Sequence, residues 1–478
     1  MLTPQQQAAD ALQRIWGYPS FRPPQGEIIQ SLLDGHDALI VMPTGGGKSL
    51  CFQIPALLQQ GVTLIVSPLV ALIENQVQEL RQRNLSAALL HSAVPGHERR
   101  RTLQAISQNR LRLLYLSPET LLSPKVWETL CQPQVQINGL VLDEAHCLVQ
   151  WGDTFRPAYR RLGAVRAALL KTKPARTRIA IAAFTATANP DAQATLQTAL
   201  GLQNPEVVRL NPYRNNLHLS VKTVWTPRGR KRALLKFIQA HHDQSGIVYA
   251  RTRRETEALA NWLRTEGYQT LAYHGGQVAE RRRAIEQAWL TNQCQFVVCT
   301  SAFGMGINKP DVRWVIHYQA PSTLSEYVQE VGRGGRDGKL ADALTLVSEP
   351  TGWLDPQDQQ RWKFFADNSA QLQQEARRLV RQLPTEGSVI EVTKKYEKGA
   401  IALSLLHSTG QLIWLDPFHY RLTPKTKQPK SNFFDAVKEM KSYLHGKRCR
   451  WQMLLEQFGF TDDAKTMHCG HCDNCQRS

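Results

Sequence analysis

A glycine-rich loop near the N-terminus has the composition of a phosphate-binding site. The sequence Met42-Pro-Thr-Gly-Gly-Gly-Lys-Ser49 follows the apolar run Ala38–Val41 and precedes another apolar run. Consecutive glycines let backbone N–H groups turn around phosphates at the start of a helix, a lysine can reach the β- and γ-phosphates, and a serine can ligate Mg²⁺. A strict phosphate-loop pattern has glycine in place of Met42, but three glycines still make the turn. The predicted nucleotide ligands are Thr44, Gly45, Gly46, Gly47, Lys48 and Ser49.

Two adjacent carboxylates further along the chain could complete the chemistry of phosphoanhydride hydrolysis. Asp143 and Glu144 directly follow the apolar run Gly139–Leu142, which predicts a buried strand that delivers both acids at its C-terminal end. Asp143 is placed to hold Mg²⁺ through water, and Glu144 to orient and deprotonate the attacking water. An acidic pair after an apolar run is commonly a helix cap, but its combination with the glycine-rich loop favours catalysis.

A second set of charges could stabilise the transition state. The segment Gln329-Glu-Val-Gly-Arg-Gly-Gly-Arg-Asp-Gly338 places Arg333 and Arg336 three residues apart after a glycine. Positive charge near the β- and γ-phosphates accelerates phosphoryl transfer, so these arginines are predicted to act as arginine fingers together with Gln329. If they lie on a different domain from the glycine-rich loop, hydrolysis requires domain closure.

The end of the chain carries cysteines with the spacing of a metal site. Two short CxxC steps follow a more distant cysteine, a pattern that suits a tetrahedral zinc ion bound by four thiolates. Such a site is structural, because no position is left for water. His468 and His471 are rival ligands, and an iron–sulfur cluster or unliganded thiols are the alternatives. The predicted zinc ligands are Cys449, Cys469, Cys472 and Cys475.

The length and net charge of the chain limit the functions that it can have. A chain of 478 residues corresponds to about three domains, and its 42% hydrophobic content excludes wholesale disorder. The formal net charge of +18 indicates a polyanionic partner, with nucleic acid ahead of an acidic membrane. Basic residues concentrate in Arg156–Arg178 and Lys222–Arg254, although a solvated basic face gives the same pattern. Neither a signal peptide nor an apolar run of about 18 to 20 residues is visible, which predicts a cytosolic protein without a membrane contact.

Alternating strand and helix patterns predict the elements that position these residues. Short aliphatic runs separated by longer amphipathic segments indicate βαβ units and parallel sheets. The pattern pauses at Leu202–Asn216 and restarts near Val221, which predicts two tandem sheets. The predicted strands are Ala38–Val41, Thr63–Val66, Leu111–Leu116, Gly139–Leu142, Ile179–Phe184, Gly246–Tyr249, Gln295–Cys299 and Trp314–His317.

The last third of the chain changes character. One apolar stripe predicts a helix that ends before Pro384, and Glu397–Ser408 predicts another that leads into a hairpin around Asp416-Pro417. A helix followed by a hairpin is typical of a winged helix, although a generic small α+β insert gives the same pattern. The predicted domains are residues 1–203 and 204–349 as two α/β domains, 350–386 as a helical linker, 387–430 as a winged-helix-like module, and 431–478 as a helix with the zinc segment.

The motifs together resemble a superfamily 2 helicase core, and in detail the RecQ family of DNA helicases. The resemblance runs from about Trp16 to Val347 and resumes at the final cysteines. It implies two RecA-like domains, ATP with Mg²⁺, and structural zinc. The matching segments are Gly17-Tyr-Pro-Ser-Phe-Arg-Pro-Pro-Gln25, the glycine-rich loop, Asp143-Glu-Ala-His-Cys147, Gln150-Trp-Gly-Asp-Thr-Phe-Arg156, Phe184-Thr-Ala-Thr-Ala188, Ala302–Arg313 and the arginine segment.

The resemblance also assigns roles to individual residues. It implies that Tyr18, Arg22 and Gln25 hold adenine, and that Thr185 and Thr187 link the nucleotide to domain movement. Gly304 and Asn308 would contact nucleotide and DNA, although some relatives have aspartate in place of Asn308. An aromatic-rich loop would sense single-stranded DNA, because aromatic faces stack on bases and arginine contacts phosphate. The implied DNA contacts are Trp151, Phe155, Arg156, Ser67, Pro68 and Ser117.

The chain resembles a short form of the family. It ends soon after Cys475, so neither a winged helix after the zinc ligands nor an accessory C-terminal helical domain is expected. The 387–430 segment would stand before them instead, and Lys425, Lys427 and Lys430 suggest that it binds duplex DNA.

The predicted function is an ATP-dependent DNA helicase that moves 3′→5′ on single-stranded DNA and unwinds duplex or forked DNA in recombination and repair. Its polarity follows from the resemblance alone. The alternatives are an RNA helicase, a translocase that separates no strands, or a nucleic-acid-binding protein with a silent ATP site.

Overall fold

The computed structural model describes residues 3–150, 156–304, 307–424 and 432–477. The chain divides into two units. Unit 1 contains residues 1–42, 46–210 and 370–430, and unit 2 contains residues 43–45, 211–369 and 431–478. None of the helices in the described ranges combines the length and the apolar character that crossing a lipid bilayer requires.

A parallel sheet of seven strands forms the centre of unit 1, in the order β3-β4-β2-β5-β6-β1-β7. Its strands are mostly aliphatic and buried, as expected for a sheet covered on both faces. The strands are β1 (Ala38–Val41), β2 (Val62–Val66), β3 (Ala87–Leu90), β4 (Leu113–Leu116), β5 (Ile137–Leu142), β6 (Ala180–Thr185) and β7 (Glu206–Arg209).

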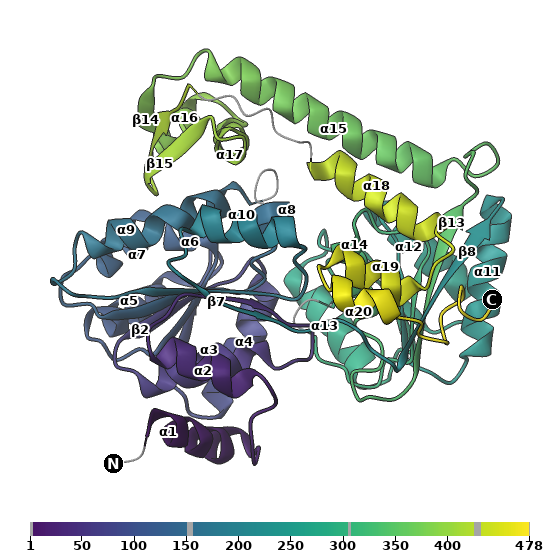
Figure 1. Ribbon diagram of the computed structural model, residues 1–478, viewed down its shortest axis with the longest axis horizontal. Helices are drawn as coiled ribbons and strands as arrows, with labels where there is room; N and C mark the ends of the chain where they lie inside the picture. Colours follow the sequence, from purple (N-terminus) through teal and green to yellow (C-terminus); the bar gives the residue numbers. More distant parts are fainter. Residues whose placement is uncertain (1–2, 151–155, 305–306, 425–431, 478) are drawn as a thin grey trace. The chain divides into compact units, whose positions relative to one another are not determined.

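Helices cover both faces of this sheet (Figure 1). One core holds Ile28, Phe52 and Ile73 from α2 to α4, and the other holds Ile106, Leu130 and Leu196 from α5, α7 and α10. The helices are α1 (Pro4–Ala11), α2 (Gln25–Leu33), α3 (Lys48–Leu58), α4 (Val70–Gln82), α5 (Gly96–Ser107), α6 (Pro118–Leu121), α7 (Pro124–Leu130), α8 (Cys147–Gln150), the 3₁₀ helix η2 (Pro157–Ala164), α9 (Val165–Leu170) and α10 (Pro190–Leu200), with a π-helical turn η1 (Leu12–Trp16) after α1.

Unit 2 contains a parallel sheet of six strands in the order β10-β11-β9-β12-β13-β8. Both sheets confirm the predicted α/β class with two tandem RecA-like domains. The strands are β8 (Leu217–Val224), β9 (Gly246–Tyr249), β10 (Thr270–Tyr273), β11 (Phe296–Cys299), β12 (Trp314–His317) and β13 (Ala341–Ser348), and the helices are α11 (Pro227–Ala240), α12 (Arg253–Thr265), α13 (Ala279–Leu290) and α14 (Leu324–Val331).

The C-terminal third contributes to both units. The long helix α15 (Gln357–Val380) connects them, and its last turns pack into a small core with α17 and the adjoining hairpin. In unit 1 this small module contains β14 (Glu386–Ser388), α16 (Val389–Lys395), α17 (Gly399–Ser408), β15 (Leu412–Asp416) and β16 (His419–Leu422), which is the order of a winged helix. In unit 2 the zinc segment contains α18 (Asn432–His445), α19 (Arg450–Gln457) and α20 (Thr461–Thr466).

The predicted boundary at residue 203 falls short of the first sheet. β7 lies beyond it and pairs in parallel with β1, from Glu206 opposite Ala38 to Arg209 opposite Val41. The four residues of β7 are largely exposed, so they lack the apolar run that identifies an inner strand. The predicted linker 350–386 likewise divides between α15 and the core of the module.

Candidate active site and nucleic-acid interface

The glycine-rich loop joins β1 to α3, two elements of unit 1, and residues 43–45 of the loop group with unit 2. Gly45 and Gly47 have φ angles of 85° and 79°, which side chains other than glycine rarely adopt. A Cβ at Gly47 would also collide with the amide of Gln25. The loop therefore brings its backbone N–H groups to the first turn of α3, where a helix N-terminus attracts phosphate.

Gln25 connects the predicted adenine-binding segment to this loop. Its Nε2 donates to the carbonyl of Gly46 at 3.1 Å, and its Oε1 accepts from the backbone N–H of Arg22 at 3.0 Å. Gln25 is buried, whereas the Tyr18 side chain is 50% exposed. The roles that the resemblance implies for these residues, stacking by Tyr18 and edge reading by Gln25, stay predictions.

Lys48 and Ser49 occupy the first turn of α3. Lys48 Nζ donates to the carbonyl of Met42 at 3.1 Å, which holds the ammonium over the loop. Gln76 Nε2 on α4 donates to Ser49 Oγ at 3.5 Å. Sequence reasoning did not identify Gln76, because an isolated glutamine on an amphipathic helix carries no recognisable signal.

Asp143 and Glu144 directly follow the C-terminal end of β5. Glu144 has a φ of 52°, a left-handed conformation that is rare for a residue with a side chain, and its N–H donates to Asp143 Oδ1 at 3.0 Å. Both side chains are buried. Burial, together with the negative charge of Glu144, raises the pKa of Asp143 to about 7, against the opposing charge of Lys48.

These oxygen donors fit a hard divalent cation. Asp143 and Ser49 offer a carboxylate and a hydroxyl, which are the ligand types that Mg²⁺ prefers. A cation would also offset the cost of burying the Asp143 carboxylate beside Glu144.

A chain of polar contacts leads from the acidic pair to β6. His146 Nδ1 lies 3.2 Å from Glu144 Oε2 and 3.1 Å from Thr185 Oγ1. Thr185 Oγ1 in turn accepts from the N–H of Thr187 at 3.2 Å. The structure thus joins the acidic pair to the two threonines that were predicted to couple nucleotide and domain movement.

In unit 2 the predicted arginines lie against the Gly304–Asn308 region. Arg333 is buried and donates to the carbonyl of Gly304. Arg336 Nη1 donates to the carbonyl of Ile307 at 3.0 Å and lies 3.4 Å from Asn308 Oδ1. The structure therefore groups four of the predicted site residues of this unit at the end of α14.

A buried ion-pair network fixes α14. Arg251 Nη2 pairs with Glu330 Oε2 at 2.7 Å, and Arg251 Nη1 pairs with Glu326 Oε1 at 2.8 Å. Burial alone would raise the pKa of Glu330, but the charge of Arg251 and the hydrogen bond and charge of His317 together outweigh it and lower this pKa to about 2. Gln329 is buried on the same helix. The network was not predicted, because its partners are distant in sequence.

The predicted DNA-contacting segments of unit 1 meet at Arg156. Its guanidinium donates to Glu119 Oε2 at 2.8 Å and to the carbonyl of Pro68 at 2.7 Å. Arg156 is therefore held by protein groups, and it joins the Ser67–Pro68 segment to the start of α6. Trp151 and Phe155 lie outside the described residues.

The two serines of this surface differ. Ser117 caps α6, because its Oγ accepts from the Thr120 N–H at 3.3 Å and lies 3.0 Å from Thr120 Oγ1. Ser67 Oγ is buried without a hydrogen-bond partner in the part of the chain that the structure describes. Of these two hydroxyl groups, only Ser67 Oγ lacks a hydrogen-bond partner among the described residues.

The four predicted zinc ligands converge. Their Sγ atoms all lie within 4.8 Å of one another, and Cys469 and Cys475 are 3.8 Å apart. A tetrahedron with zinc–sulfur bonds of about 2.3 Å has edges of about 3.8 Å, so the group fits the ion. The N–H groups of Cys469, Cys472 and Arg450 point at the sulfurs of Cys449, Cys469 and Cys472 at 3.3–3.4 Å.

The contacts of the His471 ring are with aromatic neighbours. Its Nε2 lies 3.4 Å from the hydroxyl of Tyr213, and its ring lies 4.9 Å from that of His218. The four-cysteine set was thus predicted correctly.

The zinc segment covers the edge of the unit 2 sheet. The Asp473 N–H donates to Leu219 O at 3.1 Å, and Asp473 Oδ2 accepts from the Val221 N–H at 3.1 Å. Arg450 pairs with the same carboxylate at 2.9 Å. Because β8 is the edge strand, these contacts satisfy backbone groups that would otherwise pair with another chain.

The winged-helix-like module packs on unit 1 through its second helix. α17 contacts both the core of the module and η2, and Ala402, Leu403, Leu405 and Leu406 are all buried. Arg161 Nη1 donates to the carbonyl of Pro417 at 3.2 Å. The helix before the hairpin is therefore covered by protein, and the duplex binding predicted for the 387–430 segment stays a prediction. Lys425, Lys427 and Lys430 lie outside the described residues.

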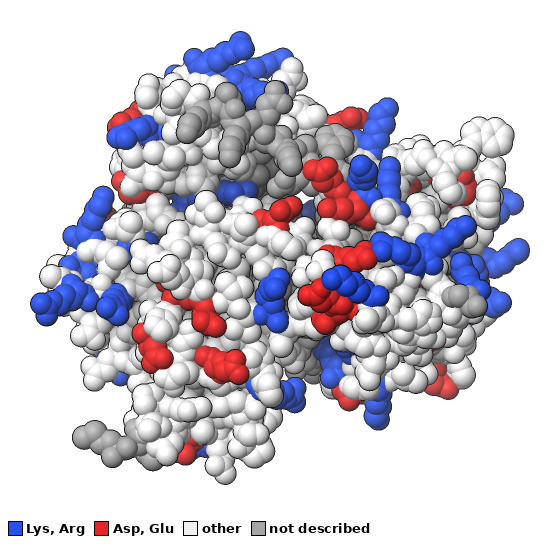
Figure 2. All heavy atoms as spheres, in the orientation of Figure 1, with Lys and Arg blue, Asp and Glu red and all other residues white. Residues whose placement is uncertain are grey.

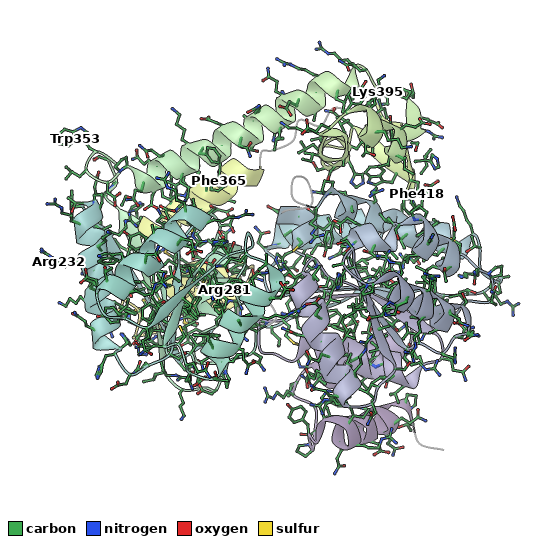
Figure 3. All side chains as sticks on the ribbon, turned by 180° about the vertical axis from the view of Figure 1, so that it is seen from behind. Arg232, Arg281, Trp353, Phe365, Lys395 and Phe418 are labelled. Carbon is green, nitrogen blue, oxygen red and sulfur yellow. The ribbon has the colours of Figure 1, made fainter. Side chains whose placement is uncertain are left out.

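The tip of the module's hairpin completes this contact, and it gives a prediction. Phe418 meets Trp127 edge to face at 5.2 Å and points from the hairpin toward the helices of unit 1 (Figure 3). Replacing Phe418 with alanine should weaken docking by about 2 kcal/mol, because a half-buried ring loses apolar contact and its aromatic partner. The measurement is the rate at which a protease cleaves the module from the native protein.

Ile413→Ala is the matched control, because Ile413 lies on the same hairpin with its side chain exposed. Equal cleavage of Phe418→Ala and wild type would show that this contact does not hold the module.

Comparisons with known proteins agree with this organisation. Three families match: "DEAD/DEAH box helicase" over residues 22–195, "Helicase conserved C-terminal domain" over 229–338 and "RecQ zinc-binding" over 416–476. The ATP-dependent DNA helicase RecQ of Synechocystis sp. is 51% identical over 472 residues, which is 98% of each chain. The protein of the same name from Haemophilus influenzae is 37% identical over 73% of this chain, which spans 54% of that relative.

Solved structures share the fold. The Mycobacterium smegmatis helicase Lhr, bound to ssDNA and AMP-PNP, superimposes with a TM-score of 0.57 at 23% identity, covering 73% of this chain and 49% of that one. A chain that aligns with a RecQ helicase along almost its whole length, and that carries the zinc-binding segment, belongs to the RecQ family of ATP-dependent DNA helicases.

Proposed function

We propose that this helicase translocates 3′→5′ along single-stranded DNA and separates duplex or forked DNA during recombination and repair. Its polarity and its pathway are taken from the family. The observation that carries the proposal is the chain of polar contacts Glu144–His146–Thr185–Thr187. It shares unit 1 with the Arg156 junction, so one folded body contains both the hydrolytic acids and the predicted DNA contacts. A cytoplasmic location, in the cytosol or at the nucleoid, is part of the proposal.

Each proposed role follows from the local geometry. Gly45 to Gly47 and the start of α3 bind the phosphates, Lys48 binds the β- and γ-phosphates, and Glu144 activates water. We propose that Ser49 and Asp143 hold Mg²⁺, which would neutralise phosphate charge when bound. Arg333, Arg336 and Gln329 are proposed to stabilise the transition state from unit 2. If both units share one nucleotide, the proposed cycle alternates between open and closed states.

The test compares substrates that differ in one property. ATP hydrolysis is measured with DNA and RNA oligonucleotides of one sequence, and strand displacement with forks that carry either a 3′ or a 5′ single-stranded arm. Stronger stimulation by DNA and displacement from the 3′ arm support the proposal. Equal stimulation by RNA would indicate an RNA helicase, hydrolysis without displacement would indicate a translocase, and the absence of hydrolysis would indicate a binding protein.

Trp151 provides a sharper prediction about coupling. Trp151→Ala should keep basal hydrolysis but lose most of its stimulation by single-stranded DNA, because stacking on a base contributes about 1–3 kcal/mol. Trp151→Phe keeps an aromatic face and should retain most of the stimulation. Wild-type unwinding by Trp151→Ala would contradict the coupling role. Steady-state phosphate release at saturating ATP, with and without DNA, measures both effects.

A further inference from the structure

Two exposed tryptophans lie at the C-terminal ends of paired strands in unit 2. Trp225 follows β8 and is 61% exposed, and Trp353 follows β13 by a short loop and is 86% exposed. Val224 and Ser348 are register partners in the two strands. Leu354, beside Trp353, is also exposed. Single exposed apolar residues are common, but two indoles at one edge of a sheet form a surface that calls for an explanation.

The loop that presents Trp353 is tightly held. The N–H of Glu349 donates to Val224 O at 3.0 Å, and its carbonyl accepts from the Gly352 N–H at 3.1 Å. Its carboxylate accepts from the N–H groups of Thr351 at 2.6 Å and Leu354 at 3.0 Å. Trp225 follows Val224, and Trp353 follows Gly352. Both of these preceding residues are hydrogen-bonded to the Glu349 backbone. The loop therefore exposes the Trp353 indole to solvent while hydrogen bonds hold the loop backbone.

A buried ion pair attaches the same loop to α11. Arg230 is fully buried and donates to Asp355 Oδ2 at 2.8 Å and to Asp358 Oδ2 at 3.2 Å. Glu349, Asp355 and Asp358 thus direct their charges into the protein. The acidic residues of the loop therefore contribute little to its surface.

Exposed basic residues follow Trp225 along the chain. Arg228, Lys231 and Arg232 lie on the first turns of α11 and are exposed, and they belong to the basic stretch Lys222–Arg254 that the proposed ATP site does not use. Figure 2 shows Lys and Arg side chains on the flank of unit 2 where Figure 1 places α11. In Figure 3, Arg232 and Trp353 point outward from the same flank. We call Trp225, Arg228, Arg232 and Trp353 the α11 patch.

We propose that the α11 patch is a second contact site for single-stranded DNA, separate from the predicted aromatic-rich loop of unit 1. Flat indole faces stack on any base, and the arginines neutralise phosphates, so the pair of features matches a single strand. A duplex hides its base faces, and an acidic polypeptide offers charge without flat rings. The inference rests on the proposed function in one respect, because the strand is the DNA on which the motor acts.

The experiment measures affinity by fluorescence anisotropy for labelled single strands of two lengths, about 10 and about 30 nucleotides, with the full-length protein. A short strand occupies one contact site, and a long strand can reach a second. The double variant Trp225→Ala/Trp353→Ala should bind the long strand about tenfold more weakly and the short strand as wild type does. Trp225→Phe/Trp353→Phe should restore the long-strand affinity, because phenylalanine also stacks.

The arginines give an independent readout. Arg228→Ala/Arg232→Ala should reduce the magnitude of the slope of log affinity against log salt by about 1.4 for the long strand, because each of two phosphate contacts on a single strand contributes about 0.7. Lys339→Ala/Leu340→Ala is the matched control. Both of its residues are exposed just before β13 begins, at the opposite edge of the same sheet.

The outcomes separate the two proposals. Unchanged long-strand affinity in the tryptophan variant would overturn the α11 patch while leaving the motor intact. Failure of single-stranded DNA to stimulate hydrolysis by the wild-type protein would overturn the proposed function instead. If poly-glutamate displaces the long strand from wild type but not from the tryptophan variant, the patch binds acidic polypeptides and the assignment to DNA is wrong.

Discussion

Replacing Lys48 with alanine should abolish ATP hydrolysis, with kcat falling by about a thousandfold or more. Lys48 starts α3 and is held over the loop by its bond to Met42 O at 3.1 Å. Its charge also opposes the effects that raise the pKa of Asp143, which places it in the electrostatic field of the acidic pair. Alanine would remove the only predicted side-chain cation within the phosphate loop while leaving the backbone turn intact.

The control and the readouts distinguish lost chemistry from lost folding. Lys125→Ala removes an exposed lysine at the start of α7, within the same unit, and should hydrolyse ATP as wild type does. Thermal unfolding should be unchanged in both variants, because neither lysine contributes to the core. Hydrolysis by Lys48→Ala within tenfold of wild type would show that the loop does not act as proposed.

Loss of one zinc ligand should have the largest effect on stability. Cys472 is fully buried, and it packs in the same core as Tyr443 and Trp451. Cys472→Ser should release the metal and destabilise unit 2 by about 5 kcal/mol or more, because structural zinc contributes binding energy directly to folding. A change of that size lowers the unfolding midpoint by more than about 10 °C. Metal analysis and thermal unfolding measure the two effects.

His471→Ala is the matched control for this prediction. Its ring faces Tyr213 and His218, so the variant should keep its zinc and unfold near the wild-type temperature. One equivalent of zinc in purified Cys472→Ser would contradict the four-thiolate site. Loss of zinc in His471→Ala would instead make this histidine a ligand.

The inner strands could be predicted because each one carries its own signal. Runs such as Phe296–Cys299 are apolar throughout, and the structure places them inside a parallel sheet, paired on both sides. Edge elements such as β7 and β8 carry a mixed pattern, because only one side of an edge strand pairs with a neighbour. Their place in a sheet depends on pairing with strands distant in sequence, which no local window contains.

The candidate site likewise contains features that the sequence could predict and contacts that it could not. Glycine spacing, the acidic pair and the cysteine steps could be recognised because backbone geometry and ligand chemistry act over a few residues. Arg156 shows the limit: its type suggested a phosphate contact, but the structure holds it against Glu119 and Pro68. Its partners lie far away in sequence, and only the packing of α6 and β2 brings them within hydrogen-bond distance.

The sequence by itself determined the chemistry of this protein: the phosphate loop, the acidic pair, the zinc ligands and the succession of two parallel sheets. Tertiary structure alone decided that α17 faces η2, that Asp473 covers β8, and that Trp225 and Trp353 share one edge of a sheet. The physical reason is the distance along the chain between the residues that interact. Turn conformations and metal spacing are set by neighbouring residues, whereas the surface that a helix or an indole faces is set by the packing of the whole unit.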